Sequence, residues 1–296
     1  MKERTIYALG FFDGVHLGHQ ALLKACKTLA QEQGCRAGVV TFITHPDSLV
    51  SGKTPALINT PGDRRCLLSG FGMETVVELP FDKALMSMHW QDFIQMLQAD
   101  YGAAGFVCGD DFRFGYRGEG NARILQAYCQ SAGLPQATVA EQMLDDVRIS
   151  SSHIRNLIEA GQMAQAVAFL GHPHRLSGTV IQGRQLGRTI GIPTANLALP
   201  EGVICPRLGV YACTAEAEGR RYLAVTNIGT RPTVGGHHIT VEPWLLDFAG
   251  DLYGKHISLD FHAFLRPEQK FASLADLQAE IHKNAGQTRE ILEDTL

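Results

Sequence analysis

Residues 5–19 of this 296-residue chain, TIYALGFFDGVHLGH, decide the fold of its first half. Thr5–Leu9 is an apolar run of strand length, and the loop Phe12–Gly18, which contains two glycines, follows it. From His19 to about Gln33, apolar residues recur at the spacing of an amphipathic helix. A strand, a short glycine-containing loop and a helix begin a βαβ unit, which predicts a parallel sheet.

The alternation of strand and helix patterns continues along the first half of the chain. Further strands are expected at 36–42, 75–79, 105–108 and 137–142, with helices around 63–70, 90–101 and 121–132. This order predicts a doubly wound, Rossmann-like sheet, and ligands on such sheets bind outside the carboxyl ends of the strands. We therefore expect the chemistry in Gly10–His19, Phe42–Ser48 and Gly109–Gly120.

After residue 150 the pattern changes. Two short helices are expected in Ser150–Leu170, and Gly171-His172-Pro173 ends the helical run. Strand patterns follow at 178–181, 210–215, 222–227, 239–248 and 257–264, and no long helical pattern separates them. Such a series predicts an antiparallel barrel or sandwich. A last helix is expected at Ser273–His282, capped by Ser273. We therefore predict two domains, which comprise residues 1–174 and 175–296.

Composition limits the classes of function. Apolar residues make up 45% and charged residues 19%, which is typical of a soluble globular protein. The net charge of −4 argues against nucleic acid and anionic membranes as partners. No signal peptide or membrane-spanning stretch is expected. Seven cysteines without a Cys-x-x-Cys pair indicate neither a disulfide framework nor a zinc site, so we expect a cytoplasmic location.

The loop Phe12–His19 has the features of a phosphate-binding turn. Gly14 and Gly18 let phosphate oxygens approach the backbone, and the first turn of a helix presents unpaired N–H groups to an anion. His16 and His19 could donate hydrogen bonds to phosphoryl oxygens as charge develops. The alternatives are histidines that only cap and pack, and a metal site, for which two ligands are too few.

A second glycine-rich stretch occupies Gly183–Asn196 and contains three spaced glycines and two arginines. It could cradle phosphates, or its glycines could serve only bulges and turns; spacing alone does not decide between the two. Neither this stretch nor Ser51–Thr54 is a Walker motif, since the latter has Asp47 where a glycine is needed.

Several longer stretches carry a resemblance to a known family. Phe12–His19 resembles the signature of the His-x-Gly-His nucleotidyltransferases. Other stretches are similar to the prokaryotic bifunctional riboflavin kinase/FMN adenylyltransferases. In the first half these are 41–46 (TFITHP), 109–115 (GDDFRFG) and 149–155 (ISSSHIR). In the second half they are 183–196 (GRQLGRTIGIPTAN), 209–212 (GVYA), 227–233 (NIGTRPT), 242–248 (EPWLLDF) and 251–254 (DLYG). The resemblance covers essentially the whole chain.

The resemblance implies a nucleotidyltransferase domain that makes FAD and a barrel domain that phosphorylates riboflavin. ATP would be the co-substrate, riboflavin, FMN and FAD the substrates and products, and Mg²⁺ the cofactor. In the first domain the resemblance gives His16 and His19 a catalytic role. It assigns ATP to Phe12, Asp13, Gly14, Gly18, Ser151, Ser152 and Arg155, and the flavin to His45, Gly109, Asp111, Phe112 and Phe114.

In the second domain the resemblance implies that Glu242 accepts the proton of the riboflavin 5′-hydroxyl, the task of a general base. ATP would bind at Gly183, Gly187, Arg188, Gly191, Pro193, Thr194 and Asn196. Thr194 and Asn196 would also hold the metal. Five residues depart from the family pattern: Thr44, Asn121, His153, Pro243 and Asn284. Pro243 is expected to bend the strand that carries Glu242.

Two other functions stay open at this point. One is a nucleotidyltransferase for another small phosphate acceptor, with a barrel that no longer phosphorylates flavin. The other is a flavin-binding regulator or carrier without catalysis, which would consume no ATP. In each case the expected partners are small molecules, and assembly into a homo-oligomer is left open.

Overall fold

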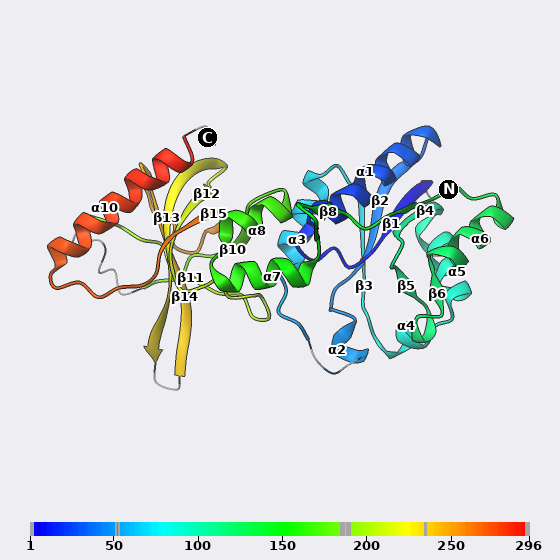
Figure 1. Ribbon diagram of the computed structural model, residues 1–296, viewed down its shortest axis with the longest axis horizontal. Coiled ribbons are helices and arrows are strands. Elements are labelled where there is room, and N and C mark those ends of the chain that lie inside the picture. Colours follow the sequence, from blue (N-terminus) through cyan, green and yellow to red (C-terminus); the bar gives the residue numbers. More distant parts are fainter. Residues whose placement is uncertain are drawn as a thin grey trace. The chain divides into compact units, whose positions relative to one another are not determined.

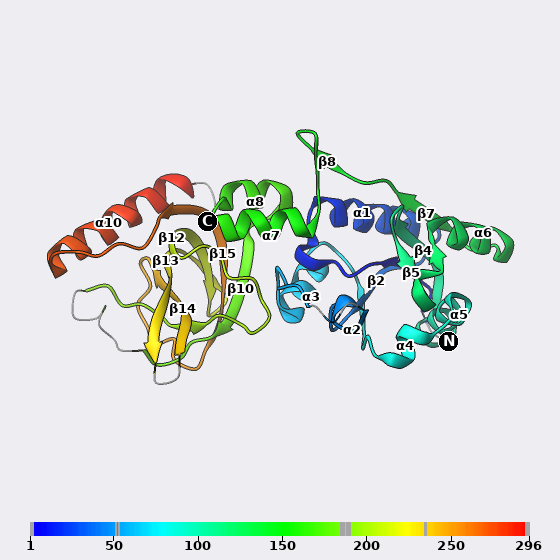
Figure 2. The same cartoon turned by 60° about the horizontal axis from the view of Figure 1, so that its bottom comes forward.

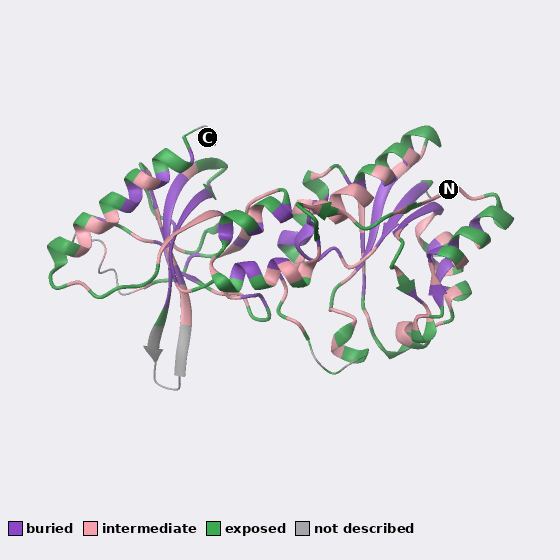
Figure 3. Cartoon of the chain, viewed as in Figure 1, coloured by how far each residue is buried: buried purple, intermediate pink, exposed green. Residues whose placement is uncertain are grey.

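The chain folds into two compact units, Met1–Ala56 with Arg64–Ser151 and Leu57–Asp63 with Ser152–Leu296 (Figure 1). The computed structural model describes residues 3–50, 52, 54–183, 187, 191–233 and 236–293, leaving out the side chains of 231–233 and 236–238. In both units the central strands are the most buried elements (Figure 3).

The first unit is built on a parallel five-stranded sheet in the order β3-β2-β1-β4-β7. Its strands are β1 (Thr5–Leu9), β2 (Arg36–Phe42), β3 (Thr75–Leu79), β4 (Ala103–Gly109) and β7 (Gln136–Val139). The strand order reverses between β1 and β4, the position where ligands bind in such sheets. The predicted parallel α/β fold is confirmed.

Alternate residues of β1 face two separate cores. Ile6 and Ala8 pack with Leu23 and Cys26 of α1 (Leu17–Glu32), whereas Tyr7 and Leu9 pack in the core on the other face. The longer helices of this unit are α3 (Pro61–Gly70), which belongs to it from Arg64 onward, α5 (Trp90–Tyr101) and α6 (Ala122–Ala132), and the short ones are α2 (Asp47–Val50) and α4 (Lys83–Ser87). Because successive side chains of a strand point to opposite faces, a sheet covered on both sides needs apolar residues at every position of its central strands.

Short strands that the sequence did not predict lie beyond the carboxyl end of β4. They are β5 (Arg113–Phe114) and β6 (Gly120–Asn121), with the 3₁₀ turn η2 (Tyr116–Gly118) between them, and the hairpin of β8 (Met143–Leu144) and β9 (Val147–Arg148) (Figure 2). Asp145 and Asp146 both have positive φ, as a two-residue hairpin turn requires. The expected strand 137–142 therefore ends at Val139 and gives way to this hairpin.

The second unit is a nearly closed antiparallel barrel in the order β10-β15-β12-β13-β14-β11. Its strands are β10 (His174–Thr179), β11 (Leu197–Ala198), β12 (Gly209–Ala217), β13 (Arg220–Thr233), β14 (Gly236–Leu245) and β15 (His256–Arg266). The Ile181 N–H donates to the Asn196 carbonyl (2.8 Å) and so joins the two ends of the sheet. The predicted barrel is confirmed.

Helices that precede and follow the barrel strands in the sequence also belong to this unit. α10 (Leu274–Ile291) is longer than expected and begins after Ser273, whose hydroxyl accepts from the Asp276 N–H as predicted. α7 (Ser151–Ala160) and α8 (Met163–Leu170) are grouped with the barrel almost entirely, whereas the sequence analysis placed residues 152–174 with the first domain. α8 packs against β10 and β15, which accounts for this grouping. The boundary between the two catalytic domains, placed at residues 174/175 by the sequence analysis, stays a prediction.

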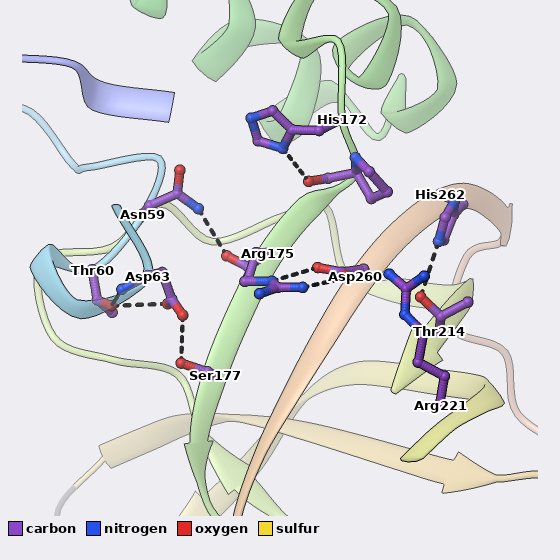
Figure 4. Close-up of polar contacts among 11 residues, drawn as sticks. Asn59, Thr60, Asp63, His172, Arg175, Ser177, Thr214, Arg221, Asp260 and His262 are labelled. Carbon is purple, nitrogen blue, oxygen red and sulfur yellow. Dashed lines mark hydrogen bonds and ion pairs between the residues drawn. The ribbon is translucent and has the colours of Figure 1, made fainter. Parts of the chain in front are cut away.

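A segment from the first half of the sequence, Leu57–Asp63, forms part of the barrel unit. Its backbone pairs with the loop before β12: the Leu57 N–H donates to the Gly202 carbonyl (2.8 Å), and the Ile204 N–H donates to the Leu57 carbonyl (2.8 Å). The buried Asn59 side chain donates to the Arg175 carbonyl on β10 (3.0 Å) (Figure 4).

The carboxylate of Asp63 closes this segment onto β10. The Ser177 hydroxyl donates to Oδ1, and the Thr60 hydroxyl donates to Oδ2 (2.8 Å) (Figure 4). On the same strand Arg175 makes a two-pronged ion pair with Asp260 of β15 (2.7 and 2.8 Å). A buried carboxylate is stable only when its oxygens are paired, so the segment and β10 stabilise each other.

Among the described residues, no helix is both long and apolar enough to span a bilayer.

We predict that a fragment 152–296 folds as a β-rich unit but is less stable than the same unit in the whole chain. It lacks Leu57–Asp63, and the loss of the four hydrogen bonds described above should cost roughly 2–6 kcal/mol of unfolding free energy. Denaturant unfolding, followed by Trp244 fluorescence in a Trp90→Phe background, measures this difference.

Ser177→Ala provides the control for this test. It should destabilise the whole chain and leave the fragment nearly unchanged, because the fragment has no Asp63 for Ser177 to contact. Equal losses in the two proteins would show that Leu57–Asp63 contributes nothing to the barrel.

Candidate active sites

The first candidate site lies where β1 leads into α1. The helix begins one residue after His16, whose Nδ1 accepts a hydrogen bond from the His19 N–H (3.3 Å) and caps the first turn. A ring nitrogen that accepts carries no proton, so neutral His16 has its proton on Nε2. The helix therefore begins two residues earlier than predicted, at Leu17, because His16 is its cap.

The two histidine rings lie face to face. Their centroids are 3.6 Å apart with an interplanar angle of 14°, and the His19 ring also contacts Phe12 at 5.2 Å. Burial lowers the pKa of His19 well below its usual value, and His16 and the Arg64 guanidinium lower it further. His19 is therefore neutral at neutral pH, when its ring can donate one hydrogen bond.

The backbone around the histidines is unusual and depends on glycine. Phe12, Gly14 and Val15 have φ of 59°, 80° and 39°, so the loop turns through left-handed conformations. A Cβ on Gly18 would lie 3.2 Å from two atoms of the His16 ring, which makes glycine the residue that leaves room for the stacked ring. The Ser151 hydroxyl donates to the Asp13 carbonyl (2.9 Å) and so helps to hold the loop.

A cavity of about 300 Å³ opens in front of this helix end. Seven of the predicted residues line it together: His16, Gly18, His19, Gly109, Asp111, Phe112 and Ser151. Phe12, Asp13 and Gly14 are buried in the loop and do not line the cavity. Ser152 and Arg155 belong to the second unit, and their assignment to ATP stays a prediction.

Arg148 also lines this cavity, and the sequence analysis did not select it. It makes ion pairs with Asp111 (2.9 Å) and Glu141 (2.6 Å), which tie the β8–β9 hairpin to the loop after β4. The Asp145-Asp146 turn was the available signal for this hairpin, since paired residues of this kind favour a tight turn.

A larger, mostly apolar cavity of about 850 Å³ lies beside Phe114 in the same unit. Phe42, Phe81, Phe93 and Tyr116 line it together with Arg113 and Arg117. The Phe114 ring stacks on Phe112 (5.4 Å, 18°), which lines the first cavity, so this aromatic pair separates the two spaces. His45 lies apart from both cavities, with its ring against the edge of Phe11 (4.6 Å).

The third space, about 470 Å³, lies between the barrel and α10 in the second unit. Glu242 on β14 lines it, opposite Asn227 of β13, and its Oε1 accepts from the Thr240 hydroxyl (2.9 Å). Gly187 and Thr194 line the same space. The sequence analysis gave no role to the other large side chains in its wall, Trp244, Arg266 and Phe271.

The bend expected at Pro243 is absent. β14 runs from Gly236 to Leu245 in continuous register with β13. The Pro243 carbonyl accepts from the Ala195 N–H (2.9 Å), which shows that this side of Pro243 faces Ala195. Ala195 lies just before the short edge strand β11, so the N–H that proline lacks would have pointed to a residue outside the ladder. N–H and C=O of one residue point to the same side of a strand, and proline is tolerated where no ladder partner is lost.

A smaller cavity of about 170 Å³ adjoins the third through Thr194, which lines both. Pro193, Ala195, Phe248 and Asp251 are among its other lining residues. Asn196, which follows the lining residue Ala195 in the sequence, is buried, and its Oδ1 has no hydrogen-bond partner among the described residues. The Asn196 amide and the Thr194 hydroxyl are oxygen donors of the type that Mg²⁺ prefers, so these residues fit the predicted metal.

The predicted glycines hold the chain close around Asn196. A Cβ on Gly183 would lie 2.4 Å from Asn196 Nδ2, and one on Gly187 would lie 2.1 Å from the Ile192 carbonyl. Gly191 has a φ of 71°, which favours glycine. Arg188, the remaining predicted ATP residue, lies outside the described residues.

Comparison with known proteins matches both halves of the chain. The FAD synthetase family model matches residues 1–153, and the riboflavin kinase family model matches residues 170–292. A bifunctional riboflavin kinase/FMN adenylyltransferase from Escherichia coli K12 is 37% identical over 98% of this chain and 93% of its own length. One from Listeria monocytogenes is 33% identical over 96% and 91%.

A solved crystal structure also resembles the whole chain. It is described as a macrolide-efflux protein from Streptococcus pneumoniae, is 29% identical and has a TM-score of 0.87. The match covers 98% of this chain and 95% of that one.

Proposed function

Since the chain belongs to the bifunctional riboflavin kinase/FMN adenylyltransferase family, we propose that its two activities occupy separate units, with adenylyl transfer at His16 and His19 and phosphoryl transfer at Glu242. The chain phosphorylates riboflavin with ATP to give FMN and ADP. It then joins FMN to the AMP of a second ATP, which gives FAD and pyrophosphate. The observation that carries the proposal is that each half matches one of the two families and contains two neighbouring cavities.

For adenylyl transfer, the ATP phosphates bind in the 300 Å³ cavity at the start of α1. The FMN phosphate attacks the α-phosphorus and pyrophosphate leaves, so the protein has to position the reactants and stabilise the added charge. The neutral rings of His16 and His19 and the N-terminus of α1 supply hydrogen-bond donors and a positive dipole end without a charged side chain. The Ser151 hydroxyl, which donates to the Asp13 carbonyl, keeps the histidine loop in place for this step. The ATP role that the resemblance gives to Arg155 stays a prediction.

The flavin of FMN binds in the neighbouring apolar cavity. A space of 850 Å³ with four phenylalanines in its wall accommodates a flat aromatic ring system, and Phe114 offers a ring face. Gly109, Asp111 and Phe112 line the phosphate side of the boundary, where the FMN phosphate has to reach the ATP. His45 contributes through Phe11 rather than as part of the cavity wall.

For phosphoryl transfer, riboflavin binds in the 470 Å³ space and ATP in the adjoining smaller one. Glu242 takes the proton of the 5′-hydroxyl as the oxygen attacks the γ-phosphorus. The Thr240 hydroxyl donates to one carboxylate oxygen and so fixes the orientation of the Glu242 carboxylate. Thr194 lies at the junction of the two spaces, where the phosphoryl group passes.

Thr194 and Asn196 hold the magnesium ion that accompanies ATP. When bound, the ion neutralises part of the charge on the phosphates. The Asn196 carbonyl is suited to this role because it is buried and lacks a hydrogen-bond partner among the described residues. We also propose a cytoplasmic location and small molecules as the only substrates, in keeping with the composition.

His19→Ala should slow FAD formation and leave FMN formation nearly unchanged. One lost donor to a developing oxyanion raises the barrier by about 2–4 kcal/mol. The measurement is chromatographic separation of flavins after incubation with riboflavin, ATP and Mg²⁺. His89→Ala, an exposed histidine of the same unit, is the matched control. FAD produced by His19→Ala at the parent rate would remove this loop from the reaction.

Glu242→Gln should reduce riboflavin phosphorylation by about 10²–10⁴-fold, because the amide keeps the shape and loses the proton acceptor. FMN added directly should still be converted to FAD at the parent rate. Glu290→Gln, exposed on α10, controls for loss of a carboxylate. Phosphorylation by Glu242→Gln within about threefold of the parent would mean that Glu242 is a solvated strand residue and that the base lies elsewhere.

A further inference from the structure

Among the described residues, Arg64 of α3 is the largest side chain that is completely buried. Its guanidinium lies over the ring of Phe11 (4.3 Å to the centroid), and its Nη2 donates to the carbonyl of Phe42 (2.6 Å). The other two nitrogens, Nε and Nη1, are buried and have no hydrogen-bond partner among the described residues.

A buried arginine with unpaired N–H groups is costly, since each such group has left water without a replacement partner. Asp13 and Glu78 are near enough to favour the charged form, while burial lowers the pKa of the Arg64 guanidinium. Glu78 itself is paired with the exposed Arg65 (3.4 Å). Arg64 therefore gains less from its surroundings than a structural ion pair would give, which indicates that its position has another use.

The two groups that Arg64 contacts lead directly into the two loops of the adenylyl transfer site. Phe11 precedes Phe12–His19, and its carbonyl accepts from the Thr41 hydroxyl of β2 (2.8 Å). Phe42 ends β2 and precedes the loop that carries His45, whose ring contacts the edge of Phe11 (4.6 Å). Phe42 also lines the 850 Å³ cavity.

We propose that Arg64 is a positioning residue for adenylyl transfer. It contacts the Phe11 ring and the Phe42 carbonyl, and so fixes the position of the histidine loop relative to the His45 loop. The proposal rests on the roles given above to these loops. Arg64 touches neither ATP nor flavin, because its side chain is fully buried. A misplacement of about 1 Å at a reacting group can cost about 100-fold in rate, so such a residue has leverage on the reaction.

The charge of Arg64 has a second effect, on His19. Burial is the first cause that lowers the pKa of His19, His16 the second and Arg64 the third. The other charged groups facing the same cavity are Asp110, Asp111, Glu141 and Arg148. Removing the positive charge of Arg64 makes protonation of His19 easier, so the pKa of His19 rises.

Arg64→Lys separates geometry from charge. Lysine keeps the positive charge beside Asp13 and Glu78 but loses the flat face over Phe11 and the forked donors. We expect kcat for FAD formation to fall by about 10–100-fold, with KM for ATP within about threefold of the parent. The acidic limb of its pH–rate profile stays where it is in the parent, because the charge is retained.

Arg64→Met removes the charge and should show the same fall in kcat. In this variant the acidic limb of the pH–rate profile for FAD formation moves to higher pH, because the pKa of His19 rises. Riboflavin phosphorylation, carried out in the other unit, should be unchanged in both variants. Arg65→Met, the exposed neighbour, should form FAD at the parent rate and with the parent pH profile.

Three results would overturn the proposal. One is a kcat for FAD formation in Arg64→Lys within about threefold of the parent. Another is an equal loss in Arg65→Met. The third is an unfolded first unit in Arg64→Lys, which would make the residue structural; if only Arg64→Met fails to fold, Arg64→Lys decides. Should His19→Ala also form FAD at the parent rate, the site assignment fails; if only Arg64→Lys does, the positioning role alone fails.

Discussion

The stacking of His16 on His19 is the contact on which the first active site depends. Two imidazole rings 3.6 Å apart are compatible only if they do not both carry a positive charge. The cap on α1 adds the same requirement, because His16 Nδ1 has to accept from the His19 N–H. Gly18 leaves space for the His16 ring, and the left-handed residues Phe12 and Gly14 bring the chain into it. In the proposed reaction, this site would therefore meet anionic phosphates with neutral donors and a helix dipole.

The barrel site solves a similar problem with different groups. In the proposed kinase site, oxygen donors on Thr194 and Asn196 suit a cation that the nucleotide brings with it. The acceptor side is a single carboxylate, Glu242, held by Thr240 on the same strand. Phosphoryl transfer to an alcohol needs a proton acceptor, whereas FMN attacks through a phosphate that is already charged. This chemical difference would account for a carboxylate in the proposed kinase site and paired histidines in the proposed adenylyl transfer site.

Much of this architecture follows from local patterns in the sequence. Alternating strands and helices predict the parallel sheet, and strands without helices between them predict the barrel. What the patterns miss depends on pairing between distant residues. Asn59 and Asp63 look like polar residues of a loop, and only the folded barrel supplies Arg175 and Ser177 as partners. Arg64 has the charge of a surface residue, yet it is buried, with its guanidinium over the Phe11 ring and bonded to the Phe42 carbonyl. Pro243 predicts a bend because its missing donor usually breaks a ladder, but here it falls beside the end of a two-residue edge strand.

The central claim, that the adenylyl transfer site works with a neutral histidine pair, can be tested by NMR of ¹⁵N-histidine-labelled protein as a function of pH. His16→Gln and His19→Gln spectra assign the two rings among the twelve histidines. The structure predicts that both rings are neutral at pH 7, that His16 carries its proton on Nε2, and that His19 begins to protonate only well below its usual pKa. A proton on Nδ1 of His16 at pH 7, or a His19 that titrates at or above its usual pKa, would contradict the account.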